Sequence, residues 1–242
     1  MTTGTIYGVG LGPGDPDLMS VRADRLLRGA RHVAYFRKAG KPGQARQIVD
    51  GLVPDDASEI AMEYPVTTEI PIDDPRYNAV LAAFYENCAK QLQALSDQGE
   101  HVVVLCEGDP FFYGSFMHLY ARLRTVAPVE VVPAITGMSG AWTATGDPIT
   151  WGVDIRTVLT ATLPEEVLAE RMAQTDALVV MKIGRNIGKV TRALTKAGLF
   201  ERAWIVEYAQ MPNQSVSRLA DRDDNCVPYF SIIIVHGQGR RP

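Results

Sequence analysis

The sequence predicts an α/β protein made of two α/β domains. Short apolar runs rich in β-branched residues, such as Val102–Leu105, have the length and composition of strands buried on both faces. Amphipathic stretches with helical spacing alternate with these runs, which is typical of sheets that carry helices on their faces. A segment of glycines and small hydroxyl residues at 133–140 separates two such halves. We therefore expect domains at 1–135 and 136–242.

The composition is that of an ordinary globular protein. Of the 242 residues, 46% are hydrophobic and 21% are charged, so the chain can bury a substantial core. The net charge of −4 and the isoelectric point of about 5.6 argue against a nucleic-acid partner. The sequence contains neither an apolar run of about 18 residues nor the basic and apolar regions of a secretory signal. We expect a cytoplasmic protein that binds neither nucleic acid nor a membrane.

The cysteines and histidines point to no disulfide and no metal site. The cysteines are far apart, odd in number and in no C-x-x-C pair: Cys88, Cys106 and Cys226. This pattern is typical of reduced core residues. The four histidines lack the spacing of metal ligands, so we predict no bound metal.

The first domain begins with a strand, a helix and a second strand. Residues 5–11 are apolar enough for the first strand, which runs into the turn Gly12–Pro16. A helix is expected at 20–28 and a strand at 32–36. We expect the segment 57–74 to be irregular, because it holds prolines and several acidic residues.

A long helix opens at Asp74-Pro75, where an N-cap residue precedes a proline at the first helical position. Its apolar stripe, which ends at Gly99, consists of Leu81, Phe84, Cys88, Leu92 and Leu95. The buried strand 102–105 follows. A helix near 116–123, with Ser115 as its expected N-cap, and a strand at 129–132 complete the domain.

The second domain is expected to contain strands near 156–161, 177–181, 204–208 and 229–235. Helices are expected near 164–173 and 187–197, the latter ended by Gly198. From Ala209 onward, strands follow one another without a clear helix between them. This order predicts that part of the second sheet is antiparallel.

The glycine-rich start of the chain does not fit a dinucleotide or phosphate site. G-x-G-x-x-G requires a third glycine five residues after the first, but those positions hold Pro13 and Asp15. No Walker loop is present, and G-x-S-x-G is absent, although Gly137–Gly140 resembles it superficially. We therefore interpret Gly12–Pro16 as a tight turn that ends the first strand.

Several strand ends carry turns that suit a ligand site. Glu107–Pro110 follows the buried strand and precedes three aromatic residues, and Gly12–Pro16 follows the first strand. In open α/β sheets, ligands bind beyond the carboxyl ends of strands. Ordinary Gly-Asp-Pro turns, with aromatics returning to the core, would explain the same residues. Three further segments could join these turns in holding a cofactor by backbone groups: Thr136-Gly137, Met181–Asn186 and Glu207–Gln210.

Four segments, in this order, resemble the class III S-adenosylmethionine-dependent tetrapyrrole methyltransferases: Gly8–Pro16, Glu107–Gly114, Pro133–Gly137 and Met181–Asn186. The resemblance covers essentially the whole chain. Cues to one branch of the family lie at 35–40, 69–71, 105–110, 161–166 and 227–231. Ala134 and Gly137 depart from the pattern, since relatives often carry glycine and serine there.

The resemblance implies two α/β domains of the tetrapyrrole methylase type, with S-adenosylmethionine in the cleft between them, and a homodimer. It implies methylation at C20 of precorrin-2 to give precorrin-3A in cobalamin biosynthesis, without a metal, and with S-adenosylhomocysteine as the second product. Carried over position by position, the cofactor-binding residues are Pro13, Glu107, Gly108, Asp109, Phe112, Thr136, Gly137, Met181 and Ala209.

Methylation at a meso carbon leaves a proton to be removed, so a base is needed. Asp15 and Asp109, at facing strand ends, are the candidates, with Tyr113 as a further one. Either carboxylate could instead be a turn residue that caps a backbone N–H.

Precorrin-2 carries many carboxylates, so a basic rim is expected in this acidic protein. The sequence-local candidate is the basic cluster Arg37, Lys38, Lys41 and Arg46. A solvated surface loop would explain this cluster equally.

Two other interpretations stay open. A sister methyltransferase of the same pathway would act on cobalt-loaded factor II or on another ring carbon. A non-catalytic module would use the same turns to bind a nucleotide.

Overall fold

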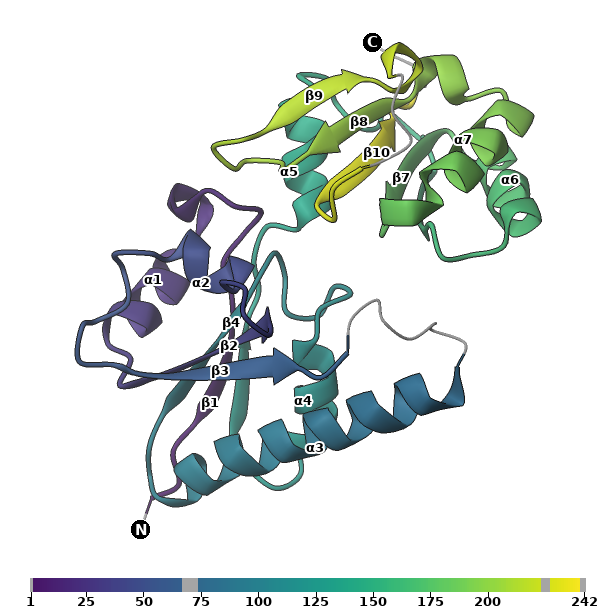
Figure 1. Cartoon of the computed structure of the whole chain (residues 1–242). Coiled ribbons are helices and arrows are strands. Elements are labelled where there is room, and N and C mark those ends of the chain that lie inside the picture. The colour runs from purple at the N-terminus through teal and green to yellow at the C-terminus, as the bar shows by residue number, and fades with distance from the viewer. Residues whose placement is uncertain (1, 67–73, 223–226, 240–242) are drawn as a thin grey trace. The chain divides into compact units, whose positions relative to one another are not determined.

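The computed structural model describes residues 2–66, 74–222 and 227–239 (Figure 1). Cys226 and the family cue at 69–71 lie outside this part of the chain. The chain divides into two compact units, Met1–Thr136 and Gly137–Pro242. None of the helices in the described part of the chain is both long and apolar enough to cross a membrane.

The first unit contains a parallel five-stranded sheet in the order β3-β2-β4-β1-β5. Its strands are β1 (Ile6–Gly10), β2 (His32–Lys38), β3 (Ser58–Tyr64), β4 (Val102–Cys106) and β5 (Val129–Val132). Its helices are α1 (Val21–Arg28), α2 (Gln44–Ile48), α3 (Pro75–Asp97) and α4 (Phe116–Leu123).

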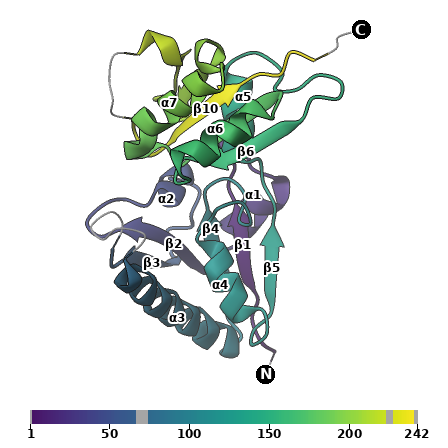
Figure 2. The ribbon, with the colours of Figure 1, turned by 90° about the vertical axis from the view of Figure 1, so that its right-hand side faces the viewer.

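Helices cover both faces of this sheet, which is why the central strand β4 is apolar throughout. Val102 and Val104 pack into the core formed with α3 and α4, which lie side by side (Figure 2). Val103 and Leu105 point the other way and pack into the core formed with α1 and α2. All five residues of β4 are buried, as the sequence predicted.

The long helix α3 begins where the sequence predicted. The Asp74 side chain accepts a hydrogen bond from the N–H of Arg76 at 2.9 Å, and the helix extends to Asp97. Cys88 and Leu92, in the middle of the predicted stripe, are buried. Cys88 and Cys106 are both buried free thiols.

The prediction of irregular structure at 57–74 was wrong over its first half. Residues Ser58–Tyr64 form β3, which pairs with β2 over seven residues. β3 is an edge strand, and its exposed Glu59 and Glu63 interrupt the apolar pattern that identifies the inner strands. Residues 67–73 of that prediction lie outside the described chain.

The second unit contains a mixed sheet in the order β6-β7-β10-β8-β9. Its strands are β6 (Arg156–Thr160), β7 (Ala177–Met181), β8 (Trp204–Glu207), β9 (Ser215–Arg218) and β10 (Ser231–Val235). β6 and β7 are parallel, and the other neighbours are antiparallel, which confirms the antiparallel part predicted after Ala209.

Three α-helices cover this second sheet: α5 (Gly137–Ala144), α6 (Glu165–Ala173) and α7 (Ile187–Lys196). α6 and α7 pack together on the face that carries Leu178 and Val180. α5 packs against β8 and β10 (Figure 1). The segment 133–140, which we expected to separate the two halves, is helical from Gly137 onward, and its small residues allow this helix to lie close to the sheet.

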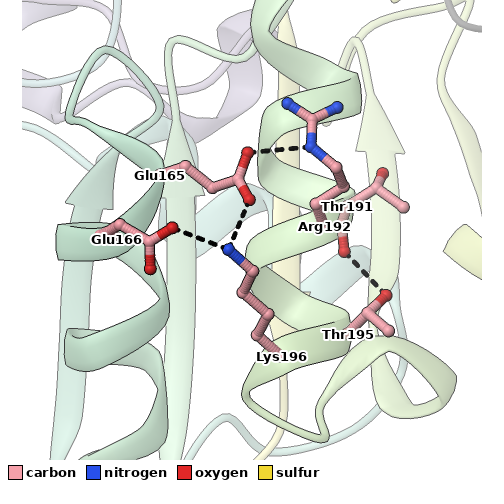
Figure 3. Close-up of polar contacts among 6 residues, drawn as sticks. All are labelled: Glu165, Glu166, Thr191, Arg192, Thr195 and Lys196. Carbon is pink, nitrogen blue, oxygen red and sulfur yellow. Dashed lines mark hydrogen bonds and ion pairs between the residues drawn. The ribbon is translucent and has the colours of Figure 1, made fainter.

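Ion pairs join the first turn of α6 to the last turns of α7 (Figure 3). Glu165 contacts Arg192 and Lys196 at 2.8 Å each, and Glu166 contacts Lys196 at 2.8 Å. The paired cations lower the pKa of Glu165, and the paired acids raise the pKa of Lys196. These exposed contacts orient two helices and involve none of the predicted site residues.

Candidate functional site

The carboxyl ends of β1 and β4 form the topological switch point of the first sheet. From β1 the chain crosses by α1 to β2 on one side, and from β4 it crosses by α4 to β5 on the other. Ligands of open α/β sheets bind where neighbouring strands diverge in this way. Both glycine turns found in the sequence follow these two strands.

The two turns are joined through their backbones. The N–H of Gly108 donates to the carbonyl oxygen of Gly12 at 2.8 Å, and the N–H of Leu11 donates to the carbonyl oxygen of Cys106 at 2.9 Å. Gly12 and Gly108 have φ values of 81° and 62°, in the left-handed region that side chains disfavour. Both positions therefore favour glycine.

A third turn, after β5, packs against the same place. A Cβ atom on Gly10 would lie 2.6 Å from the Cβ of Ala134, 2.8 Å from the oxygen of Gly108 and 2.9 Å from Cδ of Pro110. No side chain fits there. We call the turns 10–16, 107–110 and 133–134 the glycine junction.

Asp109 connects two of these turns. Its Oδ1 accepts from the N–H of Phe111 at 2.9 Å, and its Oδ2 accepts from the N–H of Ala134 at 3.0 Å. The Oδ1 of Asp15 accepts from the N–H of Asp17 at 2.9 Å and caps a short 3-10 helix. Both aspartates thus form the backbone contacts that the capping alternative anticipates.

Glu107 directly follows β4, and its side chain contacts α2. Its Oε1 accepts from the N–H of Ala45 in the first turn of α2, at 3.1 Å. The residue as a whole is exposed, but desolvation of its carboxyl raises the pKa of Glu107 to about 7. The side chain therefore acts as a link between β4 and α2.

The aromatic run after β4 lies partly on the surface. Phe111 packs edge-on against Tyr120 of α4, and Phe112 packs edge-on against Tyr113, each pair with ring centres 4.8 Å apart. Tyr113 is 43% exposed and has a φ of 56°. None of these three aromatic residues is buried, so the run does not return to the core.

Ser115 occupies the N-cap position of α4, but it does not cap the helix with its side chain. Its hydroxyl instead contacts the hydroxyl of Tyr64 and accepts from the hydroxyl of Tyr85 at 3.1 Å. The expectation of an N-cap was right in position and wrong in contact. Ser115 ties α4 to β3 and α3.

In the second unit, Met181 and Ala209 lie at the same edge of the sheet. β7 and β8 both run antiparallel to β10, so their carboxyl ends are on the same side. Met181 is half-buried at the end of β7, and Ala209 is buried just after β8. Thr136 and Gly137 are half-buried, at the boundary of the two units.

Left-handed backbone conformations occur at or next to three of the predicted site residues. Among the described residues, those other than glycine with a left-handed φ are Tyr113, Lys182, Tyr208 and Gln210. Tyr113 is itself a predicted site residue, Lys182 follows Met181, and the other two flank Ala209. Strain of this kind concentrates at functional sites. The sequence does not reveal it, because neither tyrosine, lysine nor glutamine signals a left-handed conformation.

The structure changes the interpretation of the basic cluster. Arg37 pairs with Glu63 at 2.6 Å, and Arg46 pairs with Glu59 at 3.0 Å. Hydrogen bonding to Glu59 raises the pKa of Arg46. The cluster is not a simple solvated loop, because Arg37 and Lys38 belong to β2 and Arg46 belongs to α2.

No group of three or more potential metal ligands occurs within the described ranges. The predicted site residues of the first unit that the structure brings together in the glycine junction are Pro13, Asp15, Glu107, Gly108 and Asp109. Sequence reasoning missed the close packing at Gly10 and the contacts of Gln210.

Comparisons with known proteins give one consistent result. A family model described as tetrapyrrole (corrin/porphyrin) methylases matches residues 5–220. The chain is 46% identical over 239 residues to a precorrin-2 C(20)-methyltransferase of a Sinorhizobium species, covering 99% of this chain and 98% of the relative. It is 28% identical to the cobalt-precorrin-2 C(20)-methyltransferase of Salmonella typhimurium, covering 97% of each.

A solved structure shares the fold. It is the uroporphyrin-III C-methyltransferase of Thermus thermophilus in complex with S-adenosylhomocysteine, matched with a TM-score of 0.66 and 22% identity. The match covers 96% of this chain and 97% of that chain.

Proposed function

Because the chain belongs to the tetrapyrrole (corrin/porphyrin) methylases, we propose that it is an S-adenosylmethionine-dependent methyltransferase that methylates C20 of precorrin-2 and yields precorrin-3A in cobalamin biosynthesis. The observation that carries this proposal is the 46% identity to the Sinorhizobium precorrin-2 C(20)-methyltransferase along nearly the full length of both chains. The glycine junction at the switch point of the first sheet supports it independently.

The residues of the glycine junction suit the cofactor. When bound, S-adenosylmethionine supplies an electrophilic methyl group on a sulfonium. Gly108 has no side chain that would stand between its turn and a ligand, and outside the junction Phe112 and Met181 offer apolar contacts. The proposed cofactor-binding residues are Pro13, Glu107, Gly108, Asp109, Phe112, Thr136, Gly137, Met181 and Ala209.

The proton acceptor is proposed among Asp15, Asp109 and Tyr113. We favour Asp15 over Asp109. One oxygen of Asp15, Oδ1, accepts a hydrogen bond, whereas both oxygens of Asp109 accept hydrogen bonds from backbone N–H groups. Asp15→Asn should lower the single-turnover rate of methylation with cofactor affinity unchanged. An unchanged rate in this variant would remove Asp15 from the mechanism.

The carboxylates of the substrate are proposed to meet the basic cluster. Lys38 and Lys41 are both exposed, so we assign the direct contacts to them. The two arginines of the cluster pair with glutamates of β3. Arg37 and Arg46 hold the strand and helix from which these lysines extend.

The decisive assay uses the purified protein with methyl-labelled S-adenosylmethionine and metal-free precorrin-2. NMR of the product should place the label at C20, and a chelator should leave the rate unchanged. A parallel reaction with cobalt-loaded factor II tests the alternative that the Salmonella relative's name raises. Label at another carbon, or transfer to the cobalt-loaded substrate alone, would support a sister enzyme. Cofactor binding without any transfer would support a binding module.

We further propose that the chain acts as a homodimer in the cytoplasm, as the family resemblance implies. Sedimentation of the purified protein should give about twice the 26.5 kDa mass of one chain. A monomer at assay concentration would contradict the dimer.

A further inference from the structure

The side chain of Gln210 joins the turn after β8 to α5. Its Nε2 donates to the carbonyl oxygen of Gly140 at 3.1 Å. Its own backbone N–H donates to Oε1 of Gln214 at 2.7 Å. Since a carbonyl oxygen can only accept, the contact with Gly140 requires the amide nitrogen of Gln210.

This turn has an uncommon backbone that needs external support. Tyr208 and Gln210 have φ values of 50° and 60°, and both flank Ala209. A left-handed residue with a long side chain persists where its surroundings over-determine it. The N–H of Tyr208 donates to the carbonyl oxygen of Phe230 at 2.8 Å, so the residue just before β10 fixes one end of the turn. Gln210 and its contacts fix the other end.

The contact joins two segments that are 70 residues apart in the chain. Gly140 lies in the first turn of α5, which begins at Gly137 and packs against β8 and β10 (Figure 1). Ala209 and Gly137 are both proposed cofactor-binding residues. Gln210 therefore sets the position of one of them relative to the helix that starts at the other.

We infer that Gln210 is a positioning residue for the cofactor: its side-chain amide holds Ala209 and the start of α5 in their binding arrangement before the cofactor arrives. This inference rests on the proposed function for its two cofactor contacts. The positioning depends on the N–H donor of the side-chain amide and not on the size of the side chain.

Three variants test separately the amide donor of Gln210, the size of its side chain and its left-handed backbone. Gln210→Glu keeps the size and removes the donor. Gln210→Lys keeps a donor. Gln210→Asn tolerates a left-handed backbone but is too short to reach Gly140. The matched control is Gln174→Glu, at the exposed C-cap of α6.

Calorimetric titration with S-adenosylhomocysteine should show a Kd about tenfold higher for Gln210→Glu and Gln210→Asn, and within about threefold of wild type for Gln210→Lys. The KM for precorrin-2 should stay unchanged in all of them. Hydrogen exchange without the cofactor should be faster in 137–144 for the first two variants. The control should match the wild type in every measurement.

The outcomes are distinct for the two proposals. If the wild type binds S-adenosylhomocysteine and both Gln210→Glu and Gln210→Asn bind it equally well, the positioning role is wrong. An equal loss of affinity in Gln210→Lys would also overturn it, because the donor would then not matter. If the wild type does not bind S-adenosylhomocysteine, the proposed function itself fails, whatever the exchange data show.

Discussion

The N–H of Gly108 donates to the carbonyl oxygen of Gly12 across 2.8 Å, and this bond joins the turns that follow two adjacent parallel strands. Gly12 and Gly108 are 96 positions apart, and both have left-handed backbones. Their pairing brings main-chain groups together at the switch point of the first sheet, where α/β proteins bind their ligands.

Gly10→Ala should disrupt the glycine junction. The new methyl group would lie 2.6 Å from the Cβ of Ala134 and 2.8 Å from the oxygen of Gly108, so the turns must move apart. We expect a loss of about 1–3 kcal/mol in the free energy of unfolding, and weaker binding of S-adenosylhomocysteine. Urea denaturation and calorimetry measure both. Gly29→Ala, whose Cβ would meet only an atom 3.5 Å away, is the control and should change neither.

Ser115→Ala should destabilise the protein by about 1 kcal/mol, because it removes the hydroxyl that Tyr64 and Tyr85 contact. Ser115→Asp should not rescue stability, since Ser115 does not cap α4 with its side chain. Ser20 is the matched comparison, because its Oγ accepts from the N–H of Ala23 at 3.1 Å and caps α1. At this position, Ser20→Asp should restore the stability that Ser20→Ala loses. Full rescue by Asp at position 115 would contradict the contact we describe.

The titration of Glu107 should lower the free energy of unfolding as the pH rises. Burial raises its folded pKa from 4.5 to about 7, so the folded protein binds a proton that the unfolded chain has lost in this interval. Stability from this group is fully present below about pH 4.5 and is lost as the pH rises through 7. Glu107→Gln keeps an oxygen for the N–H of Ala45 and cannot titrate. Its urea midpoint should fall less between about pH 5 and pH 8 than that of the wild type. Equal slopes would show that Glu107 is ionised normally.

Lys38→Ala and Lys41→Ala should each raise the KM for precorrin-2 by up to about fivefold, as expected for the loss of an exposed charge pair. Arg37→Gln should raise it by less than about twofold, because Arg37 is bound to Glu63. Steady-state kinetics at saturating cofactor measure the difference. A larger effect at Arg37 than at either lysine would place the substrate carboxylates at the arginines.

Local patterns were sufficient to predict most of the fold. The helix α3 is amphipathic over its whole length and has a capping aspartate followed by proline, so its limits were predicted from neighbouring residues alone. β4 is apolar because helices cover both faces of the sheet. β3 escaped prediction because an edge strand can carry acidic residues, and its Glu59 pairs with an arginine that lies in another element. The α5 helix escaped because glycine and serine favour a turn locally, whereas close packing against the sheet requires small residues.

The candidate site was predicted in part. Glycine, aspartate and proline mark the turns of the junction in the sequence, but the bond between Gly12 and Gly108 depends on the order of strands in the sheet. The contact between Gln210 and Gly140 likewise depends on the packing of α5 against β8 and β10. Left-handed tyrosine, lysine and glutamine residues carry no sequence signal at all.

A crystal structure of the protein with S-adenosylhomocysteine tests the central claim most directly. We predict that the ligand contacts main-chain atoms of Gly108 and Asp109. Ordered ligand that touches none of the three turns of the glycine junction would contradict the account.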